Sequence, residues 1–359
     1  MASDAAPVFV VGCPRSGTYL LSLVLTAEFG IAMPVETHFM PLFAPVLPLF
    51  GDLAQAANRR RLLDCIYAFL AVWTPRSERD RDAATIRRYS LLATRPAAED
   101  IVREARDYPG LVRGLLARYA ALHGLDACGD KSAFFRHLPL DAATAALPDA
   151  RVVHVVRDGR DVCLSWLGIW TGPVNLAQGA ATWREHVEAK RAWGARHPAR
   201  YLEVRYERLL AEPLAVLEEL ATFLGRRPRH GTLAFHDSEL AATLAGGAPH
   251  AKVSEPLDPA NRDKWRTRMS TGEQELFDVV AGDTLRELGY DTPLAVPRGT
   301  ARLALALRAL GGRLHGLCSW HEAQIRAKHL LPLVLLLCQR LRLPLVRWLN
   351  RRHPLFRDD

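Results

Sequence analysis

Apolar and polar residues along this chain fall into blocks that predict strands separated by helices. Residues 8–11 form a short apolar run that predicts a buried strand, and residues 150–157 form a second run that ends in charge, as in a central parallel strand. Residues 201–205 predict a further strand, and residues 213–224 a helix that Gly225 terminates. Strands that alternate with helices indicate an α/β fold with a doubly wound parallel sheet flanked by helices.

The long segment between the first two predicted strands has a helical pattern. Apolar residues in 52–125 recur at spacings of three and four, for example at Leu62, Leu63, Ile66, Tyr67 and Leu70. We therefore expect a helical insertion over roughly these residues, and a short strand just before Cys128 is compatible with the pattern. Because ligands of such sheets bind beyond the carboxyl ends of the strands, we expect the functional site at that edge.

Composition and charge divide the chain unequally. Its 359 residues suffice for one large α/β domain with additions, and 49% hydrophobic and 24% charged residues are ordinary for a globular protein. Residues 301–359 hold eleven basic and three acidic residues, so this segment accounts for the whole net charge of +8. We predict a main domain over 1–300 and a basic, hydrophobic helical extension over 301–359, which prefers an anionic neighbour.

Cysteine spacing and terminal sequences bear on location. The six cysteines form no C-x-x-C pair and no zinc-ligand spacing, which favours reduced thiols in a cytoplasmic protein. The N-terminus lacks the pattern of a signal peptide, and the apolar residues 330–338 are too few to span a bilayer. The basic leucine-rich tail either lies on an anionic membrane surface, at the inner membrane face, or packs on the protein with its arginines in solvent.

The first predicted strand leads into the sequence G-C-P-R-S-G-T-Y-L-L at residues 12–21. A strand-to-helix turn directs unpaired backbone N–H groups and the positive end of a helix toward one point, which predicts an anion site. Arg15, Ser16 and Thr18 add side-chain donors. The loop lacks the lysine of a G-x-x-x-x-G-K-[ST] motif, which argues against ordinary ATP or GTP hydrolysis.

Three later segments carry further polar residues at predicted strand ends. Arg157 follows one strand and Ser165 lies eight residues on, so a bidentate guanidinium and a hydroxyl could together hold a second phosphate. Tyr206 follows another strand, and Lys264 lies in a basic and aromatic loop.

Taken in order, these motifs resemble those of the PAPS-dependent sulfotransferases (PAPS is 3′-phosphoadenosine 5′-phosphosulfate). The motifs are G-x-P-R-S-G-T-x-L-L, G-D-K-S, V-V-R-D-G-R-D-V-x-x-S, Y-E-x-L-L and K-W, spread over roughly residues 7–290. The likeness is greatest to the branch that includes protein-tyrosine sulfotransferases and bacterial homologues. It implies a P-loop-type sheet, no metal, and sulfuryl transfer from PAPS to a hydroxyl of an organic acceptor, with release of 3′,5′-ADP.

The resemblance also implies which residues bind the donor. The 5′-phosphosulfate would be wrapped by Arg15, Ser16, Gly17, Thr18, Tyr19 and Leu20. Within this loop Arg15 would brace the bridging oxygen between phosphate and sulfate. Arg157 and Ser165 would hold the 3′-phosphate, Tyr206 would lie near the nucleotide, and Lys264 would close over it.

The catalytic residues implied are Glu36, Arg15 and Lys131, with His38 as a second candidate for the base. Glu36 matches the base of the tyrosine-specific branch, and Lys131 matches a lysine that neutralises the transferring group. A carboxylate suits a hydroxyl acceptor, and cations suit the oxygens of an in-line displacement. Tyr19 departs from the family, which often has Thr or Ser there.

Alternatives to these assignments stay open. Arg157 could instead pair with Asp158 or Asp161 as an ordinary helix-start salt bridge, and Lys131 with an acid such as Asp130. A small-molecule kinase and a non-catalytic membrane-surface protein on the same fold are the alternative functions. We expect no nucleic-acid partner. The acceptor is open between carbohydrate, lipid, peptidyl tyrosine and small phenol.

Overall fold

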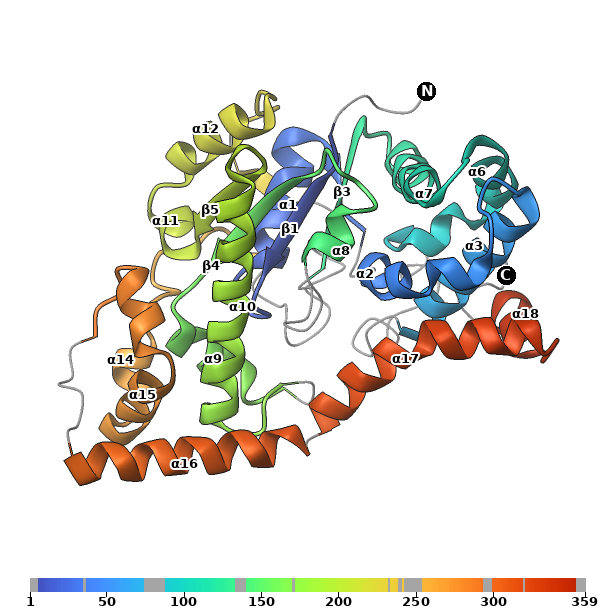
Figure 1. Ribbon diagram of the computed structural model, residues 1–359. Helices are drawn as coiled ribbons and strands as arrows, with labels where there is room; N and C mark the ends of the chain where they lie inside the picture. Colours follow the sequence, from blue (N-terminus) through green and yellow to red (C-terminus); the bar gives the residue numbers. More distant parts are fainter. Residues whose placement is uncertain are drawn as a thin grey trace.

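The computed structural model describes residues 6–34, 37–73, 88–132, 140–169, 172–231, 233–237, 241, 254–292, 299–318 and 320–352. Within these residues all strands join one parallel sheet in the order β2-β3-β1-β4-β5 (Figure 1). They are β1 (Val8–Gly12), β2 (Ile31–Ala32), β3 (Ala127–Lys131), β4 (Arg151–Val156) and β5 (Tyr201–Arg205). The predicted α/β fold with a doubly wound parallel sheet is confirmed.

Strand β1 occupies the middle of the sheet because all of its side chains can be buried. Successive side chains of a strand point to opposite faces. Phe9 and Val11 face one hydrophobic cluster, and Val8 and Val10 face another. Both faces are therefore covered by helices, as expected for a parallel sheet.

One face of the sheet is covered by the helices that follow β1 and β5. They are α1 (Thr18–Phe29), α11 (Tyr206–Ala211) and α12 (Pro213–Leu224). Gly225 ends α12 in the left-handed conformation (φ 64°), as the sequence predicts. The short 3₁₀ helix η4 (Ala234–Asp237) also packs against α1.

The other face is covered mainly by the helices predicted over 52–125 and their neighbours. These are α2 (Phe39–Phe43), η1 (Ala44–Phe50), α3 (Ala56–Trp73), η2 (Leu91–Ala97), α6 (Ala98–Glu104), α7 (Tyr108–Leu122) and α8 (Leu140–Thr144). Their apolar faces form one continuous core with Phe9 and Val11 of β1. The predicted helical insertion is present.

A third cluster lies at the carboxyl end of β4, next to the loop after β1. Cys13 and Val156 contribute to it, and so do α9 (Gly159–Trp166), α10 (Leu176–Arg196), α14 (Trp265–Arg268) and α15 (Thr271–Glu287). The 3₁₀ helix η3 (Pro198–Arg200) connects α10 to β5. This cluster packs the loop after β1 against α9, which follows β4, and against α14, which follows Lys264.

The C-terminal segment is helical, as predicted. It forms α16 (Gly299–Leu317), α17 (Trp320–Arg340) and α18 (Leu345–Arg352), which run along the lower edge of the molecule in Figure 1. Helix α16 contacts α10 and α15, whereas α17 and α18 contact α3. Among the helices of the described residues, none has the length and apolar content that crossing a membrane requires.

Two strands differ in detail from the sequence pattern. Strand β3 runs through the A-C-G-D-K sequence itself rather than only preceding it, because parallel pairing with β1 supplies the backbone hydrogen bonds. Strand β2 has only two residues, Ile31 and Ala32, and gives no period that a sequence pattern could reveal. In both cases tertiary pairing decides the structure.

Candidate active site

The loop between β1 and α1 forms the base of the site. Arg15 and Gly17 both have positive φ, 73° and 97°, and the Ser16 N–H donates to the Cys13 carbonyl (3.1 Å). Loops curled in this way direct backbone N–H groups toward one concavity. The side chain of the N-cap residue makes no capping hydrogen bond to α1 and no acid lies in the first turn, so within its own sequence this helix keeps its positive N-terminal end.

Two glycines allow the loop to lie against neighbouring elements. A Cβ at Gly12 would lie 2.7 Å from the Val155 carbonyl oxygen of β4, too close for any side chain. A Cβ at Gly17 would collide with the ring of Tyr206, which packs directly against the loop. Tyr206 therefore lies beside the predicted phosphate loop.

Arg15 links the loop to the helix after β4. Its Nε donates to the Ser165 hydroxyl (3.1 Å), and its carbonyl accepts a bond from Arg157 (3.4 Å). Ser165 is the penultimate residue of α9, which ends at Trp166. The structure thus brings Arg15, Arg157 and Ser165 together, with Ser165 bonded to Arg15 rather than to Arg157.

Arg157 is held at the end of β4 in a nearly buried position, with 7% of its surface exposed. Its guanidinium lies over the Tyr206 ring (4.4 Å from Cζ to the ring centroid) and donates to the Asn261 carbonyl (3.1 Å). An ion pair to Asp161 spans 3.7 Å. Within the described part of the chain the buried Nε of Arg157 has no hydrogen-bond acceptor, so the guanidinium keeps a donor for an anion.

The ordinary structural alternative is also present in part. Asp161 pairs with Arg157 and accepts a bond from the Trp265 N–H (2.9 Å), while burial raises the pKa of its carboxyl. Asp158 pairs instead with Arg160 (2.7 Å) and caps α9. The two acids of the R-D-G-R-D motif therefore fix the two arginines and the helix start.

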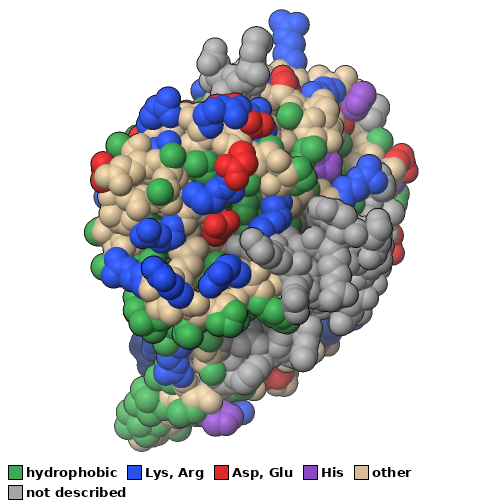
Figure 2. Space-filling view, turned by 90° about the vertical axis from the view of Figure 1, so that its right-hand side faces the viewer, with side chains coloured by type: hydrophobic (Ala, Val, Ile, Leu, Met, Phe, Trp, Pro, Cys, Tyr) green, Lys and Arg blue, Asp and Glu red, His purple; other side chains and the backbone are tan. Residues whose placement is uncertain are grey.

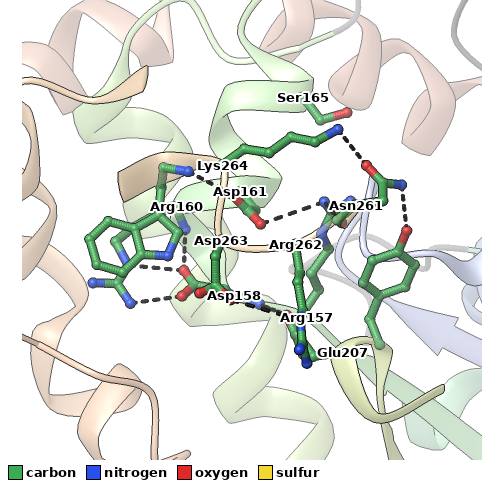
Figure 3. A network of polar contacts seen from close by, with 12 residues as sticks. Arg157, Asp158, Arg160, Asp161, Ser165, Glu207, Asn261, Arg262, Asp263 and Lys264 are labelled. Atoms are coloured by element: carbon green, nitrogen blue, oxygen red, sulfur yellow. Dashed lines mark hydrogen bonds and ion pairs between the residues drawn. The ribbon is translucent and has the colours of Figure 1, made fainter. Parts of the chain in front are cut away.

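Asn261 connects two predicted ligands of the nucleotide and was not identified from the sequence. Its side-chain amide donates to the Tyr206 hydroxyl (2.8 Å), and its side-chain carbonyl accepts from the Lys264 ammonium (2.5 Å). Figure 3 shows Lys264 extending across the site toward Ser165. A single asparagine before a basic loop carries no signal in one sequence.

Lys131 ends β3 and is almost fully buried, with 1% of its surface exposed. Its ammonium lies 3.1 Å from the ring centroid of Tyr19, in the first turn of α1. Such a cation–π contact is worth about 1–2 kcal/mol. The tyrosine at position 19, where the family often has Thr or Ser, thus has a structural role, because its ring holds Lys131 beside the loop.

The remaining residues of the loop and the candidate bases take different positions. Ser16 and Thr18 are buried at the loop, and the Leu20 side chain packs against the core. His38 is buried with a φ of 53°, and its N–H donates to the Ser132 hydroxyl (3.2 Å) beside Lys131. Glu36 lies outside the described residues.

This geometry fits a ligand with two separated anionic groups. Arg15 lies in the loop before the N-terminus of α1, and the Arg157 guanidinium, whose Nε has no acceptor among the described residues, contacts the Arg15 carbonyl. Tyr206 offers an aromatic ring between them. Charge-assisted hydrogen bonds from arginines at such positions are the strong contacts that phosphate or sulfate groups require.

Comparisons with known proteins agree with the fold. A model of the Sulfotransferase family matches residues 7–228. The sulfotransferase domain of the Synechococcus PCC 7002 olefin synthase is 22% identical, with a TM-score of 0.54, covering 82% of this chain and 99% of that domain. The sulfotransferase domain from the curacin biosynthetic pathway is 17% identical, with a TM-score of 0.51, covering 80% and 99%.

No curated protein sequence gives a significant match. These findings do not distinguish branches of the family, so the closer likeness to protein-tyrosine sulfotransferases stays a prediction. The family model covers well over half of the chain, and the parallel sheet with its anion loop after β1 agrees with it. The chain belongs to the sulfotransferase family.

Proposed function

We propose that this protein transfers the sulfuryl group of PAPS to a hydroxyl of an organic acceptor and releases 3′,5′-ADP. The observation that carries the proposal is the direct contact between Arg15 in the loop and the pair Arg157 and Ser165 after β4. One anion position at the loop would accept a phosphosulfate. A second cation, Arg157, distinguishes a 3′-phosphorylated nucleotide from ATP or AMP.

The nucleotide would be held by the network around Asn261. The Tyr206 ring lies against the loop and under Arg157, so it supports both anion positions at once. Asn261 fixes the Tyr206 hydroxyl and the Lys264 ammonium by hydrogen bonds. Lys264, which extends toward Ser165 in Figure 3, then adds positive charge beside this network.

Arg15 and Lys131 would stabilise the charge that develops during transfer. Sulfuryl transfer is an in-line displacement, and by analogy with phosphoryl transfer its catalysis depends on positioning and on cations at the oxygens of the transferring group. Arg15 would contact the oxygen that leaves with the nucleotide. Lys131, held by Tyr19, would lie beside the first turn of α1 and neutralise the sulfuryl oxygens.

A general base must take the proton of the acceptor hydroxyl. Glu36 and His38 are the two candidates. The segment after Glu36 is fixed to the end of β3, because the Thr37 hydroxyl donates to Asp130 (2.7 Å) and the His38 N–H to Ser132. These bonds hold residues 37 and 38 at the end of β3. We propose Glu36 as the base, because the resemblance of the motifs assigns that role to it.

The proposal is tested by incubating the full chain with sulfur-labelled PAPS and separate pools of sugar, phenol, tyrosyl-peptide and lipid alcohols. We expect label in an acceptor pool, 3′,5′-ADP as the co-product, and no need for added magnesium. The Arg15→Gln variant should lower turnover about 10²- to 10³-fold, as for other lost oxyanion contacts. Magnesium-dependent transfer from ATP, with PAPS inert, would instead establish the kinase alternative.

A further inference from the structure

Helix α16 packs on the protein through its small residues. Ala309 is buried, the Gly312 carbonyl accepts a bond from the Asn175 side chain (2.8 Å), and the Gly316 carbonyl accepts one from the Gln178 side chain (3.1 Å). A Cβ at Gly316 would collide with Gln178. The glycines therefore let α16 approach the start of α10 closely, with no large side chain between them.

Apart from Leu305, which packs against the third cluster, the leucines of α16 point the other way. Five leucines between 49% and 60% exposed repeat at spacings of four and three: Leu303, Leu307, Leu310, Leu314 and Leu317. At about 100° per residue they lie on the side of the helix opposite Ala309, Gly312 and Gly316. This is the reverse of an ordinary surface helix, which turns its leucines toward the core.

Helix α17 and the residues after it repeat this arrangement. Leu335 and Leu336 are buried against the body, whereas the opposite side of the helix and the segment after it expose apolar side chains. They are 36% to 68% exposed: Leu330, Leu333, Val334, Leu337, Leu341, Leu343, Leu345 and Trp348. Figure 2 shows hydrophobic side chains gathered along the lower edge of this side of the molecule, below a group of Lys and Arg side chains.

Exposed basic residues lie on the same helices as the apolar stripe. The exposed arginines on α16–α18 and on the connection between α17 and α18 are Arg302, Arg308, Arg313, Arg326, Arg340, Arg342 and Arg347. In the sequence from 299 to 352, Glu322 is the only acidic residue. An exposed apolar stripe on helices whose charged side chains are almost all cationic is the pattern of helices that lie in the interface of an anionic bilayer.

A basic pocket adjoins this surface. It has a volume of about 720 Å³ and lies between α3 and the end of α17 with α18. Five arginines line it, with Asp64 as the one acid among its lining residues: Arg60, Arg61, Arg95, Arg342 and Arg347. A cavity with this excess of guanidinium groups suits a phosphate group.

We propose that the outward surface of α16–α18 docks on an anionic lipid bilayer, with its leucines in the interface and its arginines on head-group phosphates. Pairing of two copies through the same surface is disfavoured by charge, because it would bring arginine rows together with almost no acids to neutralise them. The proposal is independent of the donor and acceptor of the reaction.

Flotation of the full chain with lipid vesicles tests the proposal. We expect binding to phosphatidylcholine vesicles that contain about 30% phosphatidylglycerol, little binding to pure phosphatidylcholine, and loss of binding as salt is raised. The double variant L310E/L314E should bind these vesicles at least tenfold more weakly. Because both leucines are exposed, the Tm of this variant should remain that of the wild type.

Leu214 on α12 provides a matched control, since it is also an exposed leucine (59%) but lies outside this surface. L214E should bind vesicles as the wild type does. R342E/R347E should lose at least tenfold in affinity for the anionic vesicles, because each arginine near such a surface contributes about fivefold. Equal binding of L310E/L314E and wild type, no binding of wild type, or dimers in light scattering that L310E/L314E abolishes would overturn the proposal.

Discussion

Replacement of Arg157 by Gln should separate the two anion positions of the site. Arg157 is nearly buried at the carboxyl end of β4 and has an Nε donor with no acceptor among the described residues. A charge-assisted hydrogen bond to a 3′-phosphate contributes about 1.5–3 kcal/mol, so R157Q should weaken 3′,5′-ADP about ten- to 150-fold. 5′-AMP, which lacks that phosphate, should lose less than about threefold.

The same substitution has a structural cost that must be measured separately. Asp161 would lose its cation at 3.7 Å while remaining buried, and leaving such a group unpaired costs about 1–3 kcal/mol. In the double variant R157Q/D161N the amide oxygen can still accept from the Trp265 N–H, so stability should recover. Affinity for 3′,5′-ADP should not recover.

Isothermal titration calorimetry of wild type, R157Q and R157Q/D161N with both nucleotides decides whether Arg157 contacts the 3′-phosphate or only pairs with Asp161. Arg151 lies at the opposite end of β4, so R151Q serves as a control arginine on the same strand and should keep the wild-type preference for 3′,5′-ADP. Equal losses for 3′,5′-ADP and 5′-AMP in R157Q, or recovery of 3′,5′-ADP binding in the double variant, would refute a 3′-phosphate contact by Arg157.

Two other predictions concern the loop and its support. G17A should lower the Tm and abolish nucleotide binding, because a Cβ there would meet the Tyr206 ring and the residue has a φ of 97°. G124A serves as the control, because Gly124 also has a positive φ (65°) but open space around it, and it should lower the free energy of unfolding in urea by only about 1 kcal/mol. Similar losses in both variants would remove the steric argument. Burial lowers the pKa of Lys190, near Cys13 of the loop, from 10.5 to about 8. Between these two pKa values the unfolded chain binds more protons than the folded chain. The contribution of Lys190 to the free energy of unfolding should therefore increase with pH across this window, by at most about 1.4 kcal/mol per pH unit. Urea unfolding of wild type and K190M at pH 8 and pH 10 measures this contribution. The same difference in the free energy of unfolding at both pH values would contradict the prediction.

The sequence predicts the framework well because its signals are local. The apolar runs at 8–11 and 150–157 correspond to β1 and β4, and the glycine-rich turn after β1 forms the loop. The order of motifs was enough to indicate the family. The sequence pattern fails where the role of a residue depends on a partner that is distant in the chain. Tyr19, for example, acts through its contact with Lys131, 112 positions away.

The same reason explains what was missed around the nucleotide site and the tail. Asn261 bridges Tyr206 and Lys264, but nothing in its neighbourhood distinguishes it from a loop asparagine. The period of α16 indicates an amphipathic helix, yet it does not tell which side packs on the body. The close approach at Gly312 and Gly316 settles that the small side is inside and the leucines are outside.

A crystal structure with 3′,5′-ADP would test the central claim most directly, because it locates both phosphates in one experiment. The account predicts the 5′-phosphate at the backbone N–H groups of residues 15–18, and the 3′-phosphate within hydrogen-bond distance of Arg157. The adenosine should then lie beside Tyr206 and Asn261. A nucleotide bound elsewhere, or a 3′-phosphate without contact to Arg157, would contradict the account.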